Sequence, residues 1–185
     1  RDIDSSYSIF SNHLQTLNTL LGEAWVNYIR PISTITWVTV DTGHRIPFYS
    51  GSTNEWFGAI VSAIPSESWI TAEILTHEAA HMWLSLEEEK EELVDEAWEH
   101  DCHYSPWRED SRPPAGIMHG LFVFTSVAEM YVQMAKSEPP SNERDRRLAL
   151  LNEQLIRAIQ VSQAFNGFSN SAIAICDMAS NMLDD

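Results

Sequence analysis

Two histidines four residues apart, His77 and His81, constrain this sequence more than any other feature. They belong to the pentapeptide His-Glu-Ala-Ala-His, in which Glu78 follows the first histidine. On an α-helix, residues four apart project from the same face about one turn apart, so both imidazoles can reach one metal ion. The pattern therefore predicts a helix at this position and a metal site on one of its faces.

The residues around the pair are small or apolar, and they indicate that the motif helix is largely buried: Ile74, Leu75, Ala79, Ala80 and Met82. A polar group without a partner is costly in such surroundings. Two explanations remain for the histidines. They bind a metal, which we expect, or they form a structural pair whose ring nitrogens are satisfied by hydrogen bonds.

Helical spacing of apolar residues recurs along the chain, with a short β-branched and aromatic part between the first two helices. We expect a first helix over residues 5–30, ended by Pro31, then strands within 32–40 and 56–64. Ser66 or Ser68 is expected to cap the motif helix, and further helices should cover 115–136, 141–165 and 171–183. The arginines of the 141–165 helix should lie on its exposed face: Arg144, Arg146, Arg147 and Arg157. The sequence thus predicts one α+β domain over residues 1–185, mainly helical, with a small antiparallel sheet beside the motif helix.

Composition and charge exclude several classes of function. The chain is 44% hydrophobic and 21% charged, which is typical of a globular protein, and its formal charge of −16 repels phosphate backbones and anionic membranes. We see no apolar run near the roughly 18 residues that span a bilayer, no signal-peptide layout, and only two cysteines, Cys102 and Cys176. We therefore expect a cytoplasmic protein that binds neither nucleic acid nor membrane. The start at Arg1, without Met, indicates a trimmed or partial chain, and no oligomeric state is predicted.

Two ligands do not complete a catalytic metal site, so a third must come from elsewhere in the chain. Glu99, which follows the motif by 18 residues, fits the layout of one large class of zinc peptidases. Its main rival is His119, which lies near the start of an apolar helix beside Gly120, where a small ligand or another backbone can approach closely. Other nearby candidates are Glu96, His100, His103 and Glu129. The acidic run 87–92 is expected to be only a solvated helix face.

A second segment, residues 104–124, reads YSPWREDSRPPAGIMHGLFVF and contains His119. Together with the motif helix, it resembles bacterial HExxH-motif peptide-modification proteins, which accompany gene clusters for ribosomally made and post-translationally modified peptides. The likeness extends from about Trp69 to Met134, a little over a third of the chain. It implies an oxidoreductase: an iron(II)- and 2-oxoglutarate-dependent dioxygenase that hydroxylates a side-chain carbon, typically the β-carbon, of a precursor peptide.

The resemblance also implies roles for particular residues. His119 becomes the third ligand beside His77 and His81, and the three neutral imidazoles leave a positive site for the dianionic cosubstrate. Arg112 is the first choice to bind the distal carboxylate of 2-oxoglutarate, and Arg108 is the second, because a guanidinium grips a carboxylate through two parallel hydrogen bonds. Three aromatic side chains are expected to wall the site: Tyr104, Trp107 and Phe122.

Two other functions remain possible on this pattern. In a zinc metallopeptidase, His77, His81 and a carboxylate such as Glu99 would hold zinc(II), and Glu78 would act as the general base that activates the bound water. In the oxygenase, Glu78 would instead orient the site or the substrate. The third possibility is a non-catalytic metal-binding module of a biosynthetic complex.

Overall fold

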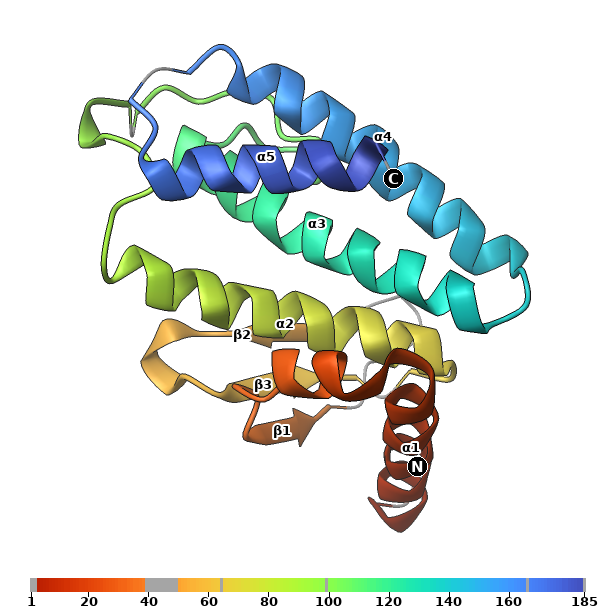
Figure 1. Ribbon diagram of the computed structural model, residues 1–185. Coiled ribbons are helices and arrows are strands. Elements are labelled where there is room, and N and C mark those ends of the chain that lie inside the picture. The colour runs from red at the N-terminus through yellow and green to blue at the C-terminus, as the bar shows by residue number, and fades with distance from the viewer. Residues whose placement is uncertain (1–2, 39–49, 64, 99, 166, 185) are drawn as a thin grey trace.

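The computed structural model describes residues 3–38, 50–63, 65–98, 100–165 and 167–184. Within these ranges the chain forms five α-helices and a three-stranded sheet (Figure 1), which confirms the predicted α+β class. The sheet lies on one side of α2 (Ser68–Glu88), and α3 (Pro114–Ser137), α4 (Asn142–Ser162) and α5 (Asn170–Asp184) lie on the other. The motif helix is therefore the layer between the sheet and the helical bundle.

The first helix, α1 (Ile3–Tyr28), is divided by Gly22, whose backbone has φ 74° and ψ −172°. A residue with a Cβ rarely adopts this conformation, so glycine allows the chain to turn sharply there. Figure 1 shows the two halves of α1 running in different directions. The second half packs on α2, where the Trp25 indole Nε1 donates a hydrogen bond to Thr76 Oγ1 over 3.0 Å.

The sheet is mixed, whereas the sequence predicted an antiparallel one. Its order is β1 (Thr34–Trp37), β3 (Ala59–Ser62), β2 (Ser50–Ser52). β1 and β3 run parallel, and β2 pairs with β3 in the antiparallel direction. The strand β2 lies between the two predicted strands, where the sequence predicted none, because a three-residue strand carries too little side-chain alternation to be recognised.

The helix ends agree closely with the sequence prediction. The prediction that Ser66 or Ser68 caps α2 is wrong, because the N-cap residue is Glu67 and its side chain makes no capping hydrogen bond. At α4, Ser141 is the N-cap, and its hydroxyl accepts a hydrogen bond from the Arg144 backbone N–H. Pro114 occupies the first turn of α3, where a missing N–H is tolerated. Two short 3₁₀ segments complete the described elements, Asn54–Trp56 and Glu96–Trp98.

The hydrophobic core has two parts that meet along α3. One part lies between α3, α4 and α5 and includes the fully buried Leu121 and Leu155. The other lies between α1, α2, α3 and β3 and includes Leu17, Ile60 and Tyr131. α3 is the one helix among the described residues that is long and apolar enough to cross a membrane by length and composition, contrary to the sequence expectation. Its position in the middle of the bundle accounts for that composition.

Candidate metal centre

The structure brings His77 and His81 together on one face of α2, as their spacing predicts. Their Nε2 atoms lie 3.2 Å apart, and their ring centroids are 4.8 Å apart. Two ligands about 2.1 Å from one ion, at 90–110° to each other, are separated by about 3.0–3.4 Å. The pair therefore fits one metal ion, and the same separation allows a hydrogen bond between two neutral rings.

Both imidazoles are held in their neutral form. Burial, together with the neighbouring His77 and His119, lowers the pKa of His81 to about 3. Burial also lowers the pKa of His77, and this effect outweighs the carboxylates of Glu78 and Glu73, which act to raise it. A neutral imidazole has a free lone pair, so at pH 7 neither ring needs to lose a proton before it can bind a metal.

His119 comes from the neighbouring helix α3 and lies beside the pair, with its ring centroid 6.3 Å from that of His81. Its Nε2 atom lies 2.6 Å from Oε1 of Glu88, in the last turn of α2. In the part of the chain that the structure describes, no group of three or more His, Cys, Asp or Glu side chains is close enough to hold a metal ion. The structure thus brings the three histidines to one place but does not close them into a ligand set.

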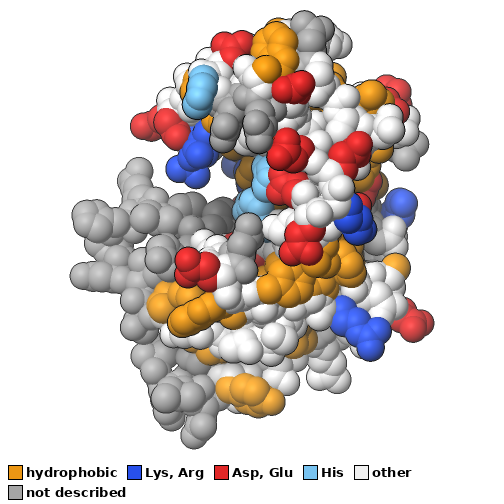
Figure 2. Space-filling view, turned by 90° about the vertical axis from the view of Figure 1, so that its left-hand side faces the viewer, with side chains coloured by type: hydrophobic (Ala, Val, Ile, Leu, Met, Phe, Trp, Pro, Cys, Tyr) orange, Lys and Arg blue, Asp and Glu red, His pale blue; other side chains and the backbone are white. Residues whose placement is uncertain are grey.

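Glu88 is one residue of this site that the sequence prediction missed. It belongs to the acidic run 87–92, which appeared to be only a solvated helix face. Glu88 follows His77 by 11 residues, close to three helical turns, so it lies on the same face of α2. That spacing could have identified it. Figure 2 shows histidine side chains in a hollow of the molecular surface, with acidic side chains beside them.

Glu78 does not point freely toward solvent. Its side chain is buried, at 3% exposure, and each of its carboxylate oxygens accepts a hydrogen bond from β2. Ser50 Oγ donates to Oε1 over 2.7 Å, and Ser52 Oγ donates to Oε2 over 2.6 Å. Residues two apart on a strand share a face, which explains why both serines reach the same carboxylate. Glu78 therefore fastens the edge strand β2 to the motif helix.

The other carboxylates predicted as possible ligands do not join the histidines in the described structure. Glu99 and the side chain of Glu96 lie outside the described residues. Glu129, on α3, lines a different cavity between α1, α3 and α5, to which neither His77 nor His81 contributes. Among the glutamates proposed as the third ligand, only Glu129 has a described side chain, and it lies away from the histidine pair.

The loop before α3 carries both predicted 2-oxoglutarate ligands. The backbones of His103 and Arg112 form an antiparallel β-bridge with two hydrogen bonds of 2.8 Å, which anchors the end of the loop. Arg112 Nε and Arg108 Nε both contact Asp110, at 2.9 and 3.0 Å. The Arg112 side chain is 34% exposed and that of Arg108 is 61% exposed. Arg112 is thus the better enclosed of the two arginines. His100, which the sequence offered as another possible metal ligand, is exposed.

The contact between Arg112 and Asp110 is an ion pair without good hydrogen-bond alignment. Arg112 Nε is buried, yet it makes no hydrogen bond that satisfies both distance and angle. The aliphatic part of the side chain packs over the first turn of α3, since a Cβ built on Gly116 would lie 3.4 Å from Arg112 Cβ. The guanidinium therefore sits beside the turn that leads to His119 and retains capacity for a further acceptor.

Gly120, next to His119, allows a close approach, but the approaching group is the indole of Trp107 and not the predicted backbone or small ligand. A Cβ at Gly120 would lie 2.4 Å from the Trp107 ring, so no larger residue fits. Trp107 stacks on Phe124 with 5.1 Å between centroids, and Phe124 meets the edge of His77 at 5.3 Å. These two aromatic residues form an apolar wall beside the histidines.

The other two aromatic residues predicted for the wall make different contacts. Tyr104 is 56% exposed and interacts with Arg157 on α4. Phe122 packs against the core between α3, α4 and α5. The sequence prediction missed Phe124, which lies one helical turn after Gly120 and so shares its face of α3.

A buried ion pair lies one turn before His77. Glu73 is 6% exposed and accepts hydrogen bonds from Arg147 Nε over 3.0 Å and from the Tyr131 hydroxyl over 2.5 Å. The sequence predicted Arg147 and Arg144 on the exposed face of α4, which is wrong. Arg147 reaches α2, and Arg144, which is 3% exposed, binds Glu138 and the Pro139 carbonyl. This cluster joins α2, α3 and α4 one helical turn before the histidine pair.

Comparison with known proteins adds no relative to this picture. No protein-family model matches the chain, and no curated protein matches it.

Proposed function

We propose that this chain is an iron(II)- and 2-oxoglutarate-dependent oxygenase that hydroxylates a side-chain carbon, typically the β-carbon, of a ribosomally made precursor peptide. The observation that carries the proposal is the convergence of three histidines from two helices. His77 and His81 present Nε2 atoms 3.2 Å apart on α2, and His119 lies next to them on α3. The resemblance of the α2 and 104–124 segments to HExxH-motif peptide-modification proteins supplies the reaction class.

The hydrogen bond between His119 and Glu88 supports a role for His119 as the third ligand. An ionised carboxylate can only accept hydrogen bonds, so a neutral His119 must carry its proton on Nε2, the atom 2.6 Å from Glu88. The lone pair then lies on Nδ1. Metal-binding histidines commonly donate their other N–H to a carboxylate, which fixes the tautomer and orients the ring. Glu88 has this function in our proposal.

The charge of the site also suits the cosubstrate. Three neutral imidazoles add no negative charge around a divalent cation, so the site stays more positive than one with a carboxylate ligand. Arg112 offers a guanidinium whose buried Nε has no aligned hydrogen bond, and it is our first candidate to bind the distal carboxylate of 2-oxoglutarate. Arg108 is the second candidate, because its side chain is largely exposed.

The alternative is a zinc metallopeptidase, and the surroundings of Glu78 support the oxygenase over it. A peptidase needs this carboxylate to take a proton from a metal-bound water. Here Ser50 and Ser52 each donate a hydrogen bond to one carboxylate oxygen, which supports a positioning role in which Glu78 holds β2 beside α2. A peptide that binds along β2 would lie next to the histidine face.

When bound, iron(II) would allow dioxygen to oxidise both substrates: one oxygen atom would enter the C–H bond as a hydroxyl group, and the other would enter 2-oxoglutarate, which becomes succinate and carbon dioxide. The chain provides the ligands, the orientation of His119 by Glu88, and the grip of Arg112 on the cosubstrate. Trp107 and Phe124 keep one side of the site apolar and exclude water from it. The proposal places the protein in the cytoplasm, with the precursor peptide as its partner and neither nucleic acid nor membrane involved.

The decisive experiment is an anaerobic titration with iron(II), with and without 2-oxoglutarate, read by visible absorption. We expect a charge-transfer band that requires both components and that His119→Ala abolishes. Succinate formation should then require iron, oxygen and the cognate peptide. Stoichiometric zinc that resists exchange, together with peptide cleavage, would support the peptidase instead, and a metal-free protein would support a binding module.

Arg112 is tested separately because its role can fail while the reaction class holds. Arg112→Ala should leave iron(II) binding intact and weaken 2-oxoglutarate binding by about 30-fold, the lower end of the about 2–5 kcal/mol cost of truncating a buried charge pair, because the Arg112 side chain is 34% exposed. Arg112→Lys should restore only part, because an ammonium lacks the planar fork. An unchanged dependence of succinate formation on 2-oxoglutarate would transfer the role to Arg108 or to another arginine.

A further inference from the structure

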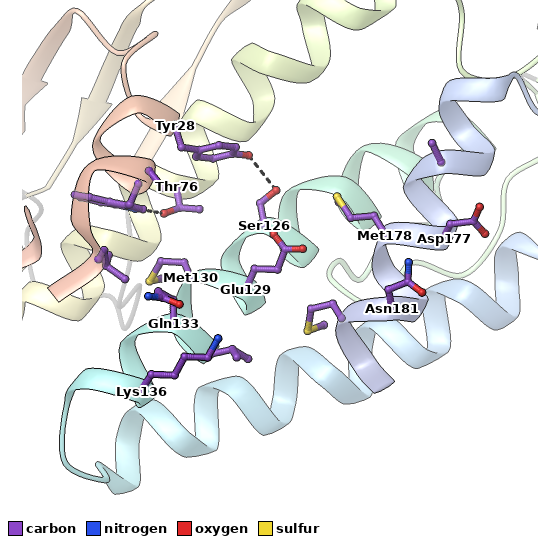
Figure 3. A pocket seen from close by; sticks show the side chains of 16 residues that line it. Tyr28, Thr76, Ser126, Glu129, Met130, Gln133, Lys136, Asp177, Met178 and Asn181 are labelled. Carbon is purple, nitrogen blue, oxygen red and sulfur yellow. Dashed lines mark hydrogen bonds between the residues drawn. The ribbon is translucent and has the colours of Figure 1, made fainter. Parts of the chain in front are cut away.

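A cavity of about 870 Å³ opens between the second half of α1, α3 and α5. This volume lies in the range of small-molecule binding sites. None of His77, His81 and His119 contributes to its lining, so it is separate from the candidate metal centre. Figure 3 shows Glu129 on the α3 wall of the cavity, with Met178 and Asn181 across from it on α5.

Much of the cavity wall is apolar and adaptable. Met130, Met178 and Met182 line it from two helices, and Leu21 and Trp25 line it from α1. Methionine side chains are flexible and polarizable, so they accommodate aliphatic groups of different shapes. A wall of this kind suits a ligand with an apolar stem.

Glu129 lines the cavity although the residue is exposed, and its carboxylate has no counter-ion among the described residues. Loss of hydration alone raises the pKa of this carboxyl group, with no ion pair or hydrogen bond to oppose the shift. Lys136 also lines the cavity, but Figure 3 shows it farther along α3, toward the end of the helix. Asp177, on α5, adds a second carboxylate to the lining. The lining therefore has an excess of negative charge, in a chain that is itself acidic.

Tyr28 is another polar group of the lining near Glu129, and it is neutral. The Tyr28 hydroxyl donates a hydrogen bond to Ser126 Oγ over 2.9 Å. Burial, with a smaller contribution from the nearby Glu129, raises the pKa of Tyr28 to about 12 against the opposing effect of its hydrogen bond to Ser126, so the phenol keeps its proton. It contributes a dipole to the cavity and no balancing charge.

We propose that this cavity binds a primary alkylammonium group carried on an apolar stem, with Glu129 as its counter-ion and the methionines around the stem. An ammonium on an aliphatic chain matches the unpaired carboxylate and the apolar wall together, whereas an anion or a neutral alcohol matches only one of them. Two sources offer this chemistry, the lysine side chain of a peptide and a free aliphatic amine. The site does not depend on the oxygenase function.

The experiment measures binding of n-hexylamine to the full chain by calorimetry and by saturation-transfer NMR. Hexanoate and hexan-1-ol are the matched probes for charge and for apolar character. We expect hexylamine to bind, and both other probes to bind at least tenfold more weakly. A capped pentapeptide with a central lysine, compared with its norleucine analogue, distinguishes the sources. Preference for the lysine peptide over hexylamine assigns the site to a peptide, and the reverse order assigns it to a free amine.

Three variants make the test specific. Glu129→Gln should weaken hexylamine binding about tenfold, as expected for loss of a charge-assisted hydrogen bond. Glu92→Gln removes the same charge from another exposed residue, one that does not line the cavity, and it should bind like the wild type. Ala174→Phe, on the α5 wall, should block the cavity without touching the carboxylate. Unchanged binding in both Glu129→Gln and Ala174→Phe, or equal binding of hexan-1-ol, would overturn the proposal.

Discussion

Replacing Glu88 by Gln tests whether this carboxylate orients His119 for metal binding. Gln keeps the size of the side chain and can still accept a hydrogen bond from Nε2, so only the charge is lost. His119 and Glu88 are 31 residues apart in sequence and lie on different helices. A local effect on the stability of one helix therefore does not explain a change in metal binding through His119.

The expected magnitude follows from the surroundings of the pair. Loss of a carboxylate that orients a metal-binding histidine typically weakens metal binding about 10- to 100-fold. The two side chains are 30% and 29% exposed, so water partly screens the charge, and Gln retains an acceptor. We therefore expect the lower end of this range for Glu88→Gln, about tenfold or ~1.4 kcal/mol. Glu88→Ala, which removes the acceptor as well, should come closer to 100-fold.

The assay is an anaerobic competition titration of iron(II) against a chromophoric chelator, with circular dichroism to verify folding. Glu89→Gln is the matched control, because it removes the same charge from the adjacent exposed residue. The control should bind iron(II) within about twofold of the wild type, as expected for an exposed charge. Tighter binding by Glu88→Gln would refute the reasoning, since it would mean that Glu88 holds His119 away from the metal.

Three further predictions concern the histidine pair and its support. His77→Ala should abolish metal retention while the circular dichroism spectrum stays that of a folded protein, and metal analysis after dialysis checks this. In the metal-free protein the pKa of His81 is lowered to about 3, below its unfolded value near 6.5, so the unfolded state binds more protons between these values. The contribution of the neutral His81 ring to the free energy of unfolding is complete above pH 6.5 and is lost as the pH falls toward 3. We expect urea unfolding to show a loss of about 1–2 kcal/mol at pH 5. The same loss of stability in a His81→Phe variant would contradict this. Arg147→Met should destabilise the protein by about 2–4 kcal/mol by leaving Glu73 buried without its cation, somewhat below the usual cost because Arg147 is 21% exposed. Thermal unfolding of Arg157→Met, whose arginine pairs only at the surface, gives the baseline.

Local spacing in the sequence was enough to predict much of this molecule. Four-residue spacing on a helix puts His77 and His81 on one face, because the helical repeat alone fixes that relation. Apolar periodicity likewise located the helices, and β-branched runs located β1 and β3. These features depend on residues within one or two turns of each other, so the chain specifies them before any tertiary contact forms.

The partners of the site residues depend instead on how the helices pack. Glu88 looked like one of several solvated glutamates until α3 brought His119 beside it. Glu78 met serines from a strand too short to be recognised, and Arg147 crossed from α4 to Glu73, 74 residues earlier in the sequence. The angle and register of packed elements select these contacts, and neither is encoded in the spacing of any single segment. The sequence by itself therefore determined the histidine pair and the helices, and only the tertiary structure decided which carboxylates surround the pair.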